Sequence, residues 1–109
     1  MKTTLLATAA VAATGCSSGP VADYRVLATI DQGSTVTKFV TVEPGATKED
    51  FQSIVDRSCG QSRSYCAIHF WDNAGLAATR FPMSGRQADA QVATFKRNKS
   101  TGYEHLEVF

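Results

Sequence analysis

Three cysteines in a chain of 109 residues constrain the fold more than any other feature of the sequence. Cys16 follows an uncharged run at residues 3–15, whereas Cys59 and Cys66 lie in the remaining part of the chain. A chain of this length forms one small domain. Because an odd number of cysteines cannot all pair within one chain, we interpret Cys16 separately from the other two.

The first fifteen residues have the composition of a secretory signal peptide. Lys2 supplies one positive charge, residues 3–14 are Thr, Leu, Ala and Val, and small residues stand directly before Cys16. The run is too short for a spanning helix, which needs about 20 apolar residues. A charged start, a short apolar middle and a small-residue end instead predict export and cleavage.

The residues around the predicted cleavage site resemble the lipobox of bacterial lipoproteins. The matching segment is Ala13-Thr14-Gly15-Cys16, and the resemblance covers residues 1–16 only. It implies that the Cys16 thiol receives a diacylglycerol, that the chain is cut after Gly15, and that the new amino terminus is acylated with a fatty acid such as palmitate. Ala13 stands where lipoboxes usually carry Leu, so an ordinary signal peptide with an incidental cysteine is the alternative.

A short tether is expected between this anchor and the folded part. Residues 16–22 are rich in Ser, Gly and Pro, which gives a flexible polar segment. By the same resemblance, Ser17 replaces the Asp that retains lipoproteins at the inner membrane. This implies a cell-envelope location, on the periplasmic side of the outer membrane if the host is Gram-negative. The expected organisation is a signal peptide at 1–15, a lipidated tether at 16–22 and a domain at 23–109.

The charge balance excludes one class of partner. The chain has 11 basic and 10 acidic side chains, and removing Lys2 with the signal peptide leaves ten of each. Nucleic-acid binders show a basic excess or stripe, so no nucleic-acid partner is expected.

Alternating and helical patterns predict a small α+β domain. We expect an antiparallel hairpin with a loop of about five residues, then a helix that begins at a capping box of Thr47 and Asp50. The predicted elements are strands at 24–30 and 36–43, a helix at 48–58, a central strand at 65–71, a weaker strand at 76–81, a helix at 85–97 and a strand at 103–109. The order β-β-α-β-(β)-α-β indicates a mixed or antiparallel sheet of four to five strands, with both helices on one face.

The prediction of the second helix depends on two sequence signals. Ser84 and Gln87 form a capping box, and Ala88, Val92 and Phe95 follow with helical spacing.

In an exported chain, Cys59 and Cys66 are expected to form a structural disulfide. The bridge would join the end of the first helix to the central strand, and closing an eight-residue loop stabilises a fold by about 2.5 kcal/mol. A redox-active pair usually shows Cys-x-x-Cys spacing, and a zinc site would need more ligands than His69 and His105 supply.

One strand face is the candidate site. Tyr65, His69 and Trp71 alternate on the central strand, and Tyr103 and His105 alternate on the last one. If these strands are neighbours, the five side chains form an aromatic face suited to a protein or glycan partner. The competing interpretation is that they are partly buried, or covered by the loop around 76–81.

These features favour a non-catalytic lipoprotein that binds another envelope protein or a wall component such as peptidoglycan. The sequence contains no Walker-type phosphate loop and no His-Glu-x-x-His motif, and we expect no enzyme activity, cofactor or metal. Two alternatives stay open. One is an inhibitor or exclusion lipoprotein, which the chain resembles only in size and in predicted location. The other is a small periplasmic enzyme or ligand carrier that uses a His69–His105 face.

Overall fold

Five strands form one mixed β-sheet in the structure, a computed structural model that describes residues 22–60 and 63–109. The strand order is β2-β3-β4-β5-β6, and this part of the chain also contains two α-helices. The predicted α+β class is therefore confirmed, and the sheet, predicted as mixed or antiparallel with four to five strands, is mixed and has five strands in the described residues. The predicted signal peptide, Cys16 and residues 17–21 of the tether lie outside the described residues.

The first two strands form the predicted antiparallel hairpin. β2 (Tyr24–Gln32) pairs with β3 (Thr35–Val42) through a connection shorter than the five residues expected, because both strands extend into the predicted loop. Gly33 takes φ +75° in this turn, a backbone conformation that glycine adopts without steric cost. The register shifts between Val26 and Ala28, so this edge strand is irregular.

The segment after β3 crosses over to a parallel strand. α2 (Lys48–Cys59) begins at the predicted capping box, in which the Asp50 amide donates to Thr47 Oγ1 (3.2 Å) and the Thr47 amide donates to Asp50 Oδ2 (2.8 Å). The helix ends at Gly60, which has φ +67°. β4 (Tyr65–Trp71) then pairs in parallel with β3 and lies at the centre of the sheet, as predicted.

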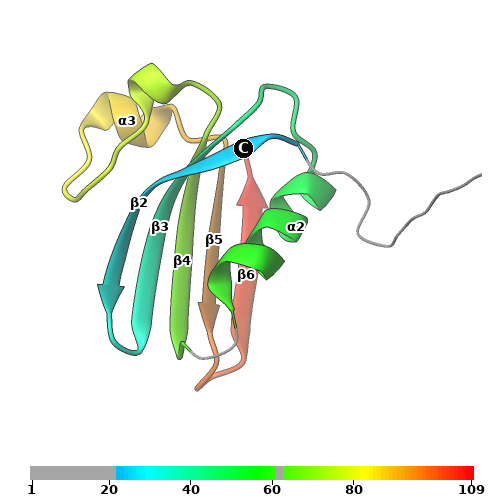
Figure 1. Ribbon diagram of the computed structural model, residues 1–109, viewed down its shortest axis with the longest axis vertical. Helices are drawn as coiled ribbons and strands as arrows, with labels where there is room; N and C mark the ends of the chain where they lie inside the picture. Colours follow the sequence, from blue (N-terminus) through cyan, green and yellow to red (C-terminus); the bar gives the residue numbers. More distant parts are fainter. Residues whose placement is uncertain (1–21, 61–62) are drawn as a thin grey trace, which may run out of the picture.

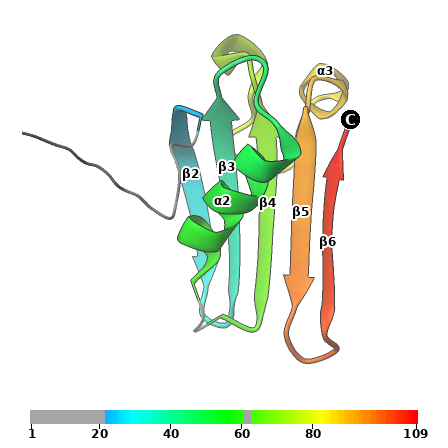
Figure 2. The ribbon, with the colours of Figure 1, turned by 90° about the vertical axis from the view of Figure 1, so that its right-hand side faces the viewer.

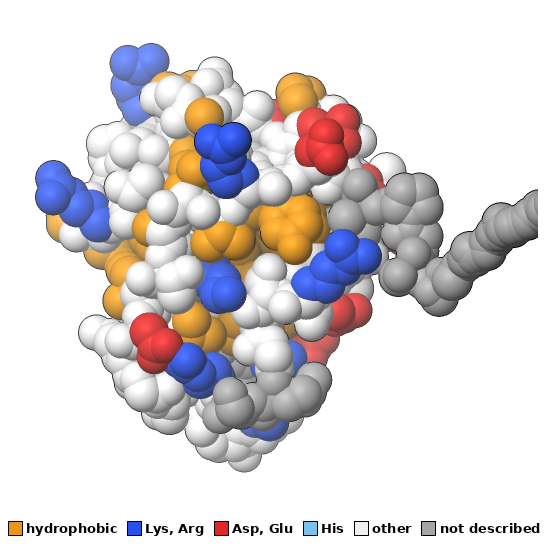
Figure 3. Space-filling view, viewed as in Figure 1, with side chains coloured by type: hydrophobic (Ala, Val, Ile, Leu, Met, Phe, Trp, Pro, Cys, Tyr) orange, Lys and Arg blue, Asp and Glu red, His pale blue; other side chains and the backbone are white. Residues whose placement is uncertain are grey.

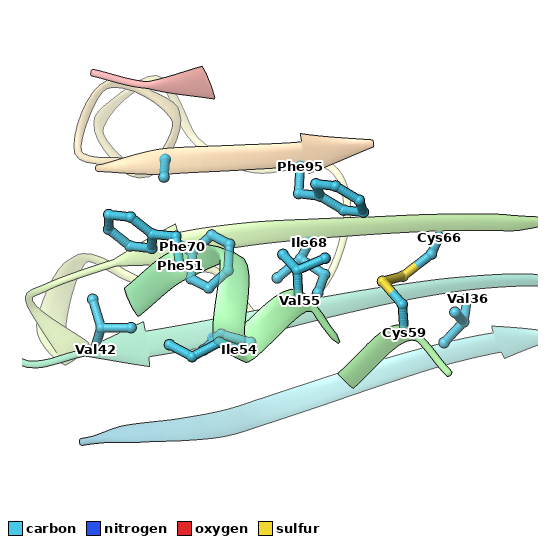
Figure 4. Close-up of a cluster of buried hydrophobic side chains, with 12 residues drawn as sticks. Val36, Val42, Phe51, Ile54, Val55, Cys59, Cys66, Ile68, Phe70 and Phe95 are labelled. Atoms are coloured by element: carbon cyan, nitrogen blue, oxygen red, sulfur yellow. A yellow bond between two sulfur atoms is a disulfide. The ribbon is translucent and has the colours of Figure 1, made fainter. Parts of the chain in front are cut away.

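The main core lies between α2 and one face of the sheet. Phe51, Ile54, Val55 and Cys59 point from the helix onto the strands (Figure 4), and all four are buried. Twelve buried residues make up this cluster: Val36, Val40, Val42, Phe51, Ile54, Val55, Cys59, Cys66, Ile68, Phe70, Ala93 and Phe95. We call the side of the sheet that they occupy the helix face.

The prediction of a weaker strand at 76–81 is wrong. This segment contains a 3-10 turn, η2 (Ala74–Leu76), followed by irregular backbone with a cis bond between Phe81 and Pro82. The Asn73 side chain accepts from the Gly75 amide (2.9 Å), so local side-chain hydrogen bonding replaces strand pairing here.

The helix predicted at 85–97 is correct at its start and wrong at its end. α3 spans only Gly85–Asp89, behind the predicted Ser84–Gln87 capping box, and Ala93–Asn98 is a strand, β5. β5 pairs with β4 on one side and β6 on the other, which satisfies its backbone groups and buries Ala93 and Phe95. Tertiary pairing thus overrides the helical spacing that joined Ala88, Val92 and Phe95.

The two helices lie on opposite faces of the sheet, which corrects the expectation that both lie on one face. Figure 1 shows α2 on one side and α3 on the other, near one end of the strands, and Figure 2 shows α2 in front of the sheet. A second, smaller buried cluster of Phe39, Trp71 and Ala78 lies on the side of α3. β6 (Tyr103–Val108) is the last strand and forms one edge of the sheet. We call the side of α3 the open face.

Candidate binding face

The five residues predicted to form a face do lie on the same side of the sheet. Cross-strand partners share a face, and the registers align Tyr65 with Asn98 and then Tyr103 across β4, β5 and β6. β4 and β6 are not neighbours, however, because β5 lies between them. The prediction that β4 and β6 are neighbours is therefore wrong, although the prediction that the five side chains share one face is correct.

Trp71 is covered rather than exposed. Its side chain is fully buried, its indole Nε1 donates to the Gln87 carbonyl oxygen (2.7 Å), and its ring stacks near Phe39 with centroids 6.1 Å apart. One connecting segment contributes Ala77, Ala78, Met83 and Ala90 to this cluster, and Ala28 and Ile30 of β2 also pack against it. We call residues 74–91 the cover, and their position confirms the competing interpretation for Trp71.

His69 lies at the edge of the cover and is half-buried. Its Nδ1 is 2.6 Å from Gln91 Oε1, and its ring centroid is 5.7 Å from that of Phe81. Burial lowers the pKa of His69, a hydrogen bond with Gln91 acts in the opposite direction, and the Lys96 charge lowers the pKa further. The imidazole is therefore neutral at pH 7 and is held by an amide partner.

The remaining part of the open face is accessible. Tyr103 is 53% exposed, His105 and Lys96 are exposed, and Tyr65 is half-buried. The Tyr103 and His105 rings lie 6.5 Å apart, and His105 pairs with Lys96 across the strands. We call Tyr65, Lys96, Tyr103 and His105 the open patch, which offers two phenol rings, an imidazole and a cation.

Two contributors to this face were missed by the sequence analysis. Lys96 falls within the helix predicted at 85–97, and Phe81 falls within the weaker strand predicted at 76–81. Period-two alternation in residues 93–98, with Ala93 and Phe95 buried and Lys96 exposed, is the signal that would have placed Lys96 on the open face. Phe81 packs against Phe39, with ring centroids 5.2 Å apart, and no local sequence pattern predicts this contact.

The two histidines do not form a joint site. His69 aligns with Thr94 and Glu107, whereas His105 aligns with Lys96 and Ala67, so the histidines lie in different cross-strand rows. Within residues 22–60 and 63–109, no three His, Cys, Asp or Glu side chains gather closely enough to hold a metal ion. A cavity of about 190 Å³ lies elsewhere, between α2 and the end of β6, with Phe51 and Val108 in its lining.

A Gly-x-Ser-x-Gly spacing does occur at residues 15–19. It lies outside the described residues and spans the predicted cleavage site, which would remove Gly15 from the mature chain.

Charged side chains form no single cluster on the face of the molecule that Figure 3 shows. Figure 3 shows Lys and Arg side chains scattered over the view, with acidic side chains among them. Arg63 and Asp31, 32 positions apart, form a bidentate pair at 2.5 and 2.6 Å, which lowers the pKa of Asp31. The pair is solvent-accessible, so its contribution to stability is small.

The predicted disulfide between Cys59 and Cys66 is present. The two Cα atoms are 5.9 Å apart, and the bridge joins the end of α2 to the start of β4. It fixes the helix against the central strand on the helix face, and both cysteines are buried.

Comparison with protein-family models, with curated proteins and with solved structures gives no match for the chain. None of the helices in the described residues has the length and apolar character needed to cross a membrane.

Proposed function

We propose that this protein is a lipid-anchored, non-catalytic binding module of the bacterial cell envelope. The observation that carries the proposal is the divided open face, in which Trp71 and Phe39 are sealed under the cover while Tyr103 and His105 stay exposed. Aromatic and cationic side chains on a rigid sheet are the groups that protein interfaces use as anchors.

The disulfide supports an exported location. Structural disulfides persist in oxidising compartments and are rare in the cytosol. The Cys59–Cys66 bridge therefore agrees with the signal peptide and lipid attachment at Cys16 that the sequence predicts.

The state of the histidines supports binding rather than catalysis. Nδ1 of His69 is hydrogen-bonded to Gln91, and the His69 ring lies against Phe81. β5 separates His69 from His105. His69 and His105 lie in different cross-strand rows, so they are not arranged as an acid–base pair. The partner class we favour is another envelope protein, with a wall component such as peptidoglycan as the second candidate.

The binding part of the proposal is tested by affinity capture from the host envelope with cross-linking. The test variant is Tyr103→Ser with His105→Ser, and the control is Glu104→Ser, which changes an exposed residue of the same strand on the helix face. We expect the double variant to lose a specific partner that both the wild-type protein and Glu104→Ser retain. Retention of that partner by the double variant would refute the open patch as the binding surface.

The anchor is tested by fractionation of cells that express Cys16→Ser. We expect the wild-type protein in the membrane pellet and Cys16→Ser in the soluble exported fraction, since a diacylated or triacylated cysteine anchors a chain stably. Identical fractionation of the two forms would contradict lipid attachment at Cys16, and would leave the binding test unaffected.

A further inference from the structure

The β6 edge of the sheet is open for further pairing. Among residues 22–60 and 63–109, β6 pairs only with β5, and five of its six residues are exposed, with Leu106 half-buried. In Figure 2, β6 forms the outer margin of the sheet, and no described element lies beyond it. An unprotected edge presents a row of unpaired amide and carbonyl groups to another strand.

The backbone hydrogen bonds identify which groups face outward. The Phe109 amide donates to the Val92 carbonyl oxygen (3.0 Å), across the space between the last two strands. In an antiparallel ladder the direction alternates from residue to residue. Tyr103, His105 and Glu107 therefore direct their backbone groups toward β5, and Glu104, Leu106 and Val108 direct theirs to the open edge.

The sequence of β6 is complementary to itself in one antiparallel register. A two-fold axis at Leu106, perpendicular to the sheet, places Leu106 opposite its own copy on the helix face. The same axis places His105 opposite Glu107 of the second copy, and Glu104 opposite Val108. All of the outward backbone groups of Glu104, Leu106 and Val108 then find partners.

Neighbouring registers that also place side chains of the same face opposite each other give less favourable side-chain pairs. An axis at His105 pairs Tyr103 with Glu107 and histidine with histidine, and an axis at Glu107 places two carboxylates directly opposite each other. Like charges directly opposite destabilise a strand pair, whereas opposite charges stabilise it.

The other edge of the sheet is protected. β2 carries the register shift between Val26 and Ala28, and Asp31 at its end is already paired with Arg63. Bulges and charged residues are the means by which edge strands avoid pairing. The two edges therefore differ, and only β6 has a regular ladder along its whole length.

The geometry points to a homodimer in which β6 of one copy pairs antiparallel with β6 of a second copy, around an axis at Leu106. The result is one continuous ten-stranded sheet. The two open patches lie on the same face of this sheet, so the dimer presents Tyr103 and His105 twice near its centre. This inference does not depend on lipid attachment or on an envelope partner.

The test is sedimentation equilibrium of the full chain carrying Cys16→Ser, purified from the exported fraction. Glu104→Pro removes an outward amide without removing a hydrogen bond to β5, because the ladder directs that amide to the open edge. We expect the wild-type strand to give a dimer and Glu104→Pro to weaken self-association at least tenfold. The control Glu104→Ala keeps the amide and should remain dimeric. A monomer for the unaltered strand at hundreds of micromolar, or an unchanged dimer for Glu104→Pro, would overturn the inference.

A charge exchange tests the register. His105→Glu places two carboxylates opposite each other and should weaken the dimer, whereas His105→Glu combined with Glu107→Lys places a carboxylate opposite an ammonium group and should restore it. Failure of the double variant to recover the dimer, while circular dichroism shows both variants folded, would exclude an axis at Leu106. Partner capture with the monomeric Glu104→Pro variant separates this result from the proposed function, since the open patch is intact in that monomer.

Discussion

At the scale of single residues, His69 is the group whose surroundings most change its chemistry. It is a half-buried histidine that faces an amide and an aromatic ring, with the Lys96 charge nearby. Burial disfavours the protonated imidazole, so the folded protein holds it in the neutral form.

This state predicts a loss of stability below neutral pH. The pKa of His69 is lower in the folded protein than its ordinary value of 6.5, so the unfolded chain takes up the proton first as the pH falls. We expect the free energy of unfolding to decline from about pH 6.5 toward the lower folded-state pKa. Urea titrations between pH 7.5 and 5.0 measure this slope, and His69→Gln should flatten it while keeping an amide partner for Gln91. The lowered pKa values of Asp31 and Asp50 act only below this window. A slope unchanged in His69→Gln would contradict the assignment.

In the candidate site, the sequence predicts which face of the sheet a side chain lies on, but it does not predict whether that side chain is exposed. Alternation placed Tyr65, His69 and Trp71 on one face, because strand side chains alternate regardless of which strands are neighbours. Exposure could not be deduced in this way. Trp71 is sealed by residues up to 19 positions further along the chain, and that contact depends on where the cover folds back.

At the scale of elements, two similar capping boxes begin two very different helices. Thr47 and Asp50 begin a helix of 12 residues with four buried side chains, whereas Ser84 and Gln87 begin one of five residues with none. A capping box therefore locates a helix start, and the length of the helix is decided by the burial of its apolar face. For that reason the first helix was predicted closely and the second was extended into what is β5.

Removal of each cap should have different consequences. Thr47→Ala should lower the global free energy of unfolding by about 1 kcal/mol, because α2 is part of the main core. Ser84→Ala removes the acceptor for the Gln87 amide (3.1 Å) in a short helix without a fully buried side chain, so we expect a smaller global loss and faster exchange of the amides at this helix start. Urea denaturation measures the first change, and hydrogen exchange at the Gln87 and Ala88 amides measures the second. Equal global losses for the two variants would contradict this distinction.

At the scale of the whole molecule, β4 joins the two buried clusters. Its Cys66, Ile68 and Phe70 belong to the core under α2, and its Trp71 belongs to the cluster under the cover. Such a strand cannot leave one cluster without disturbing the other, so the cover and the main core should unfold together. The central position of β4 was deduced from its apolar β-rich sequence. The placement of helices on opposite faces was not, since it depends on β5 replacing a helix.

The disulfide provides a way to test this cooperativity. The full chain with Cys16→Ser retains only Cys59 and Cys66, so reduction breaks their bridge without any substitution in the core. The loop-closure model predicts that the reduced form is less stable by about 2.5 kcal/mol. Trp71, the only tryptophan, reports on the cover, and far-UV circular dichroism reports on the sheet and α2. We expect both signals to give the same urea midpoint in the oxidised form, and the same lower midpoint after reduction. If Trp71 fluorescence changes at a lower urea concentration than the circular dichroism, the cover is a separate unit and β4 does not couple the two faces.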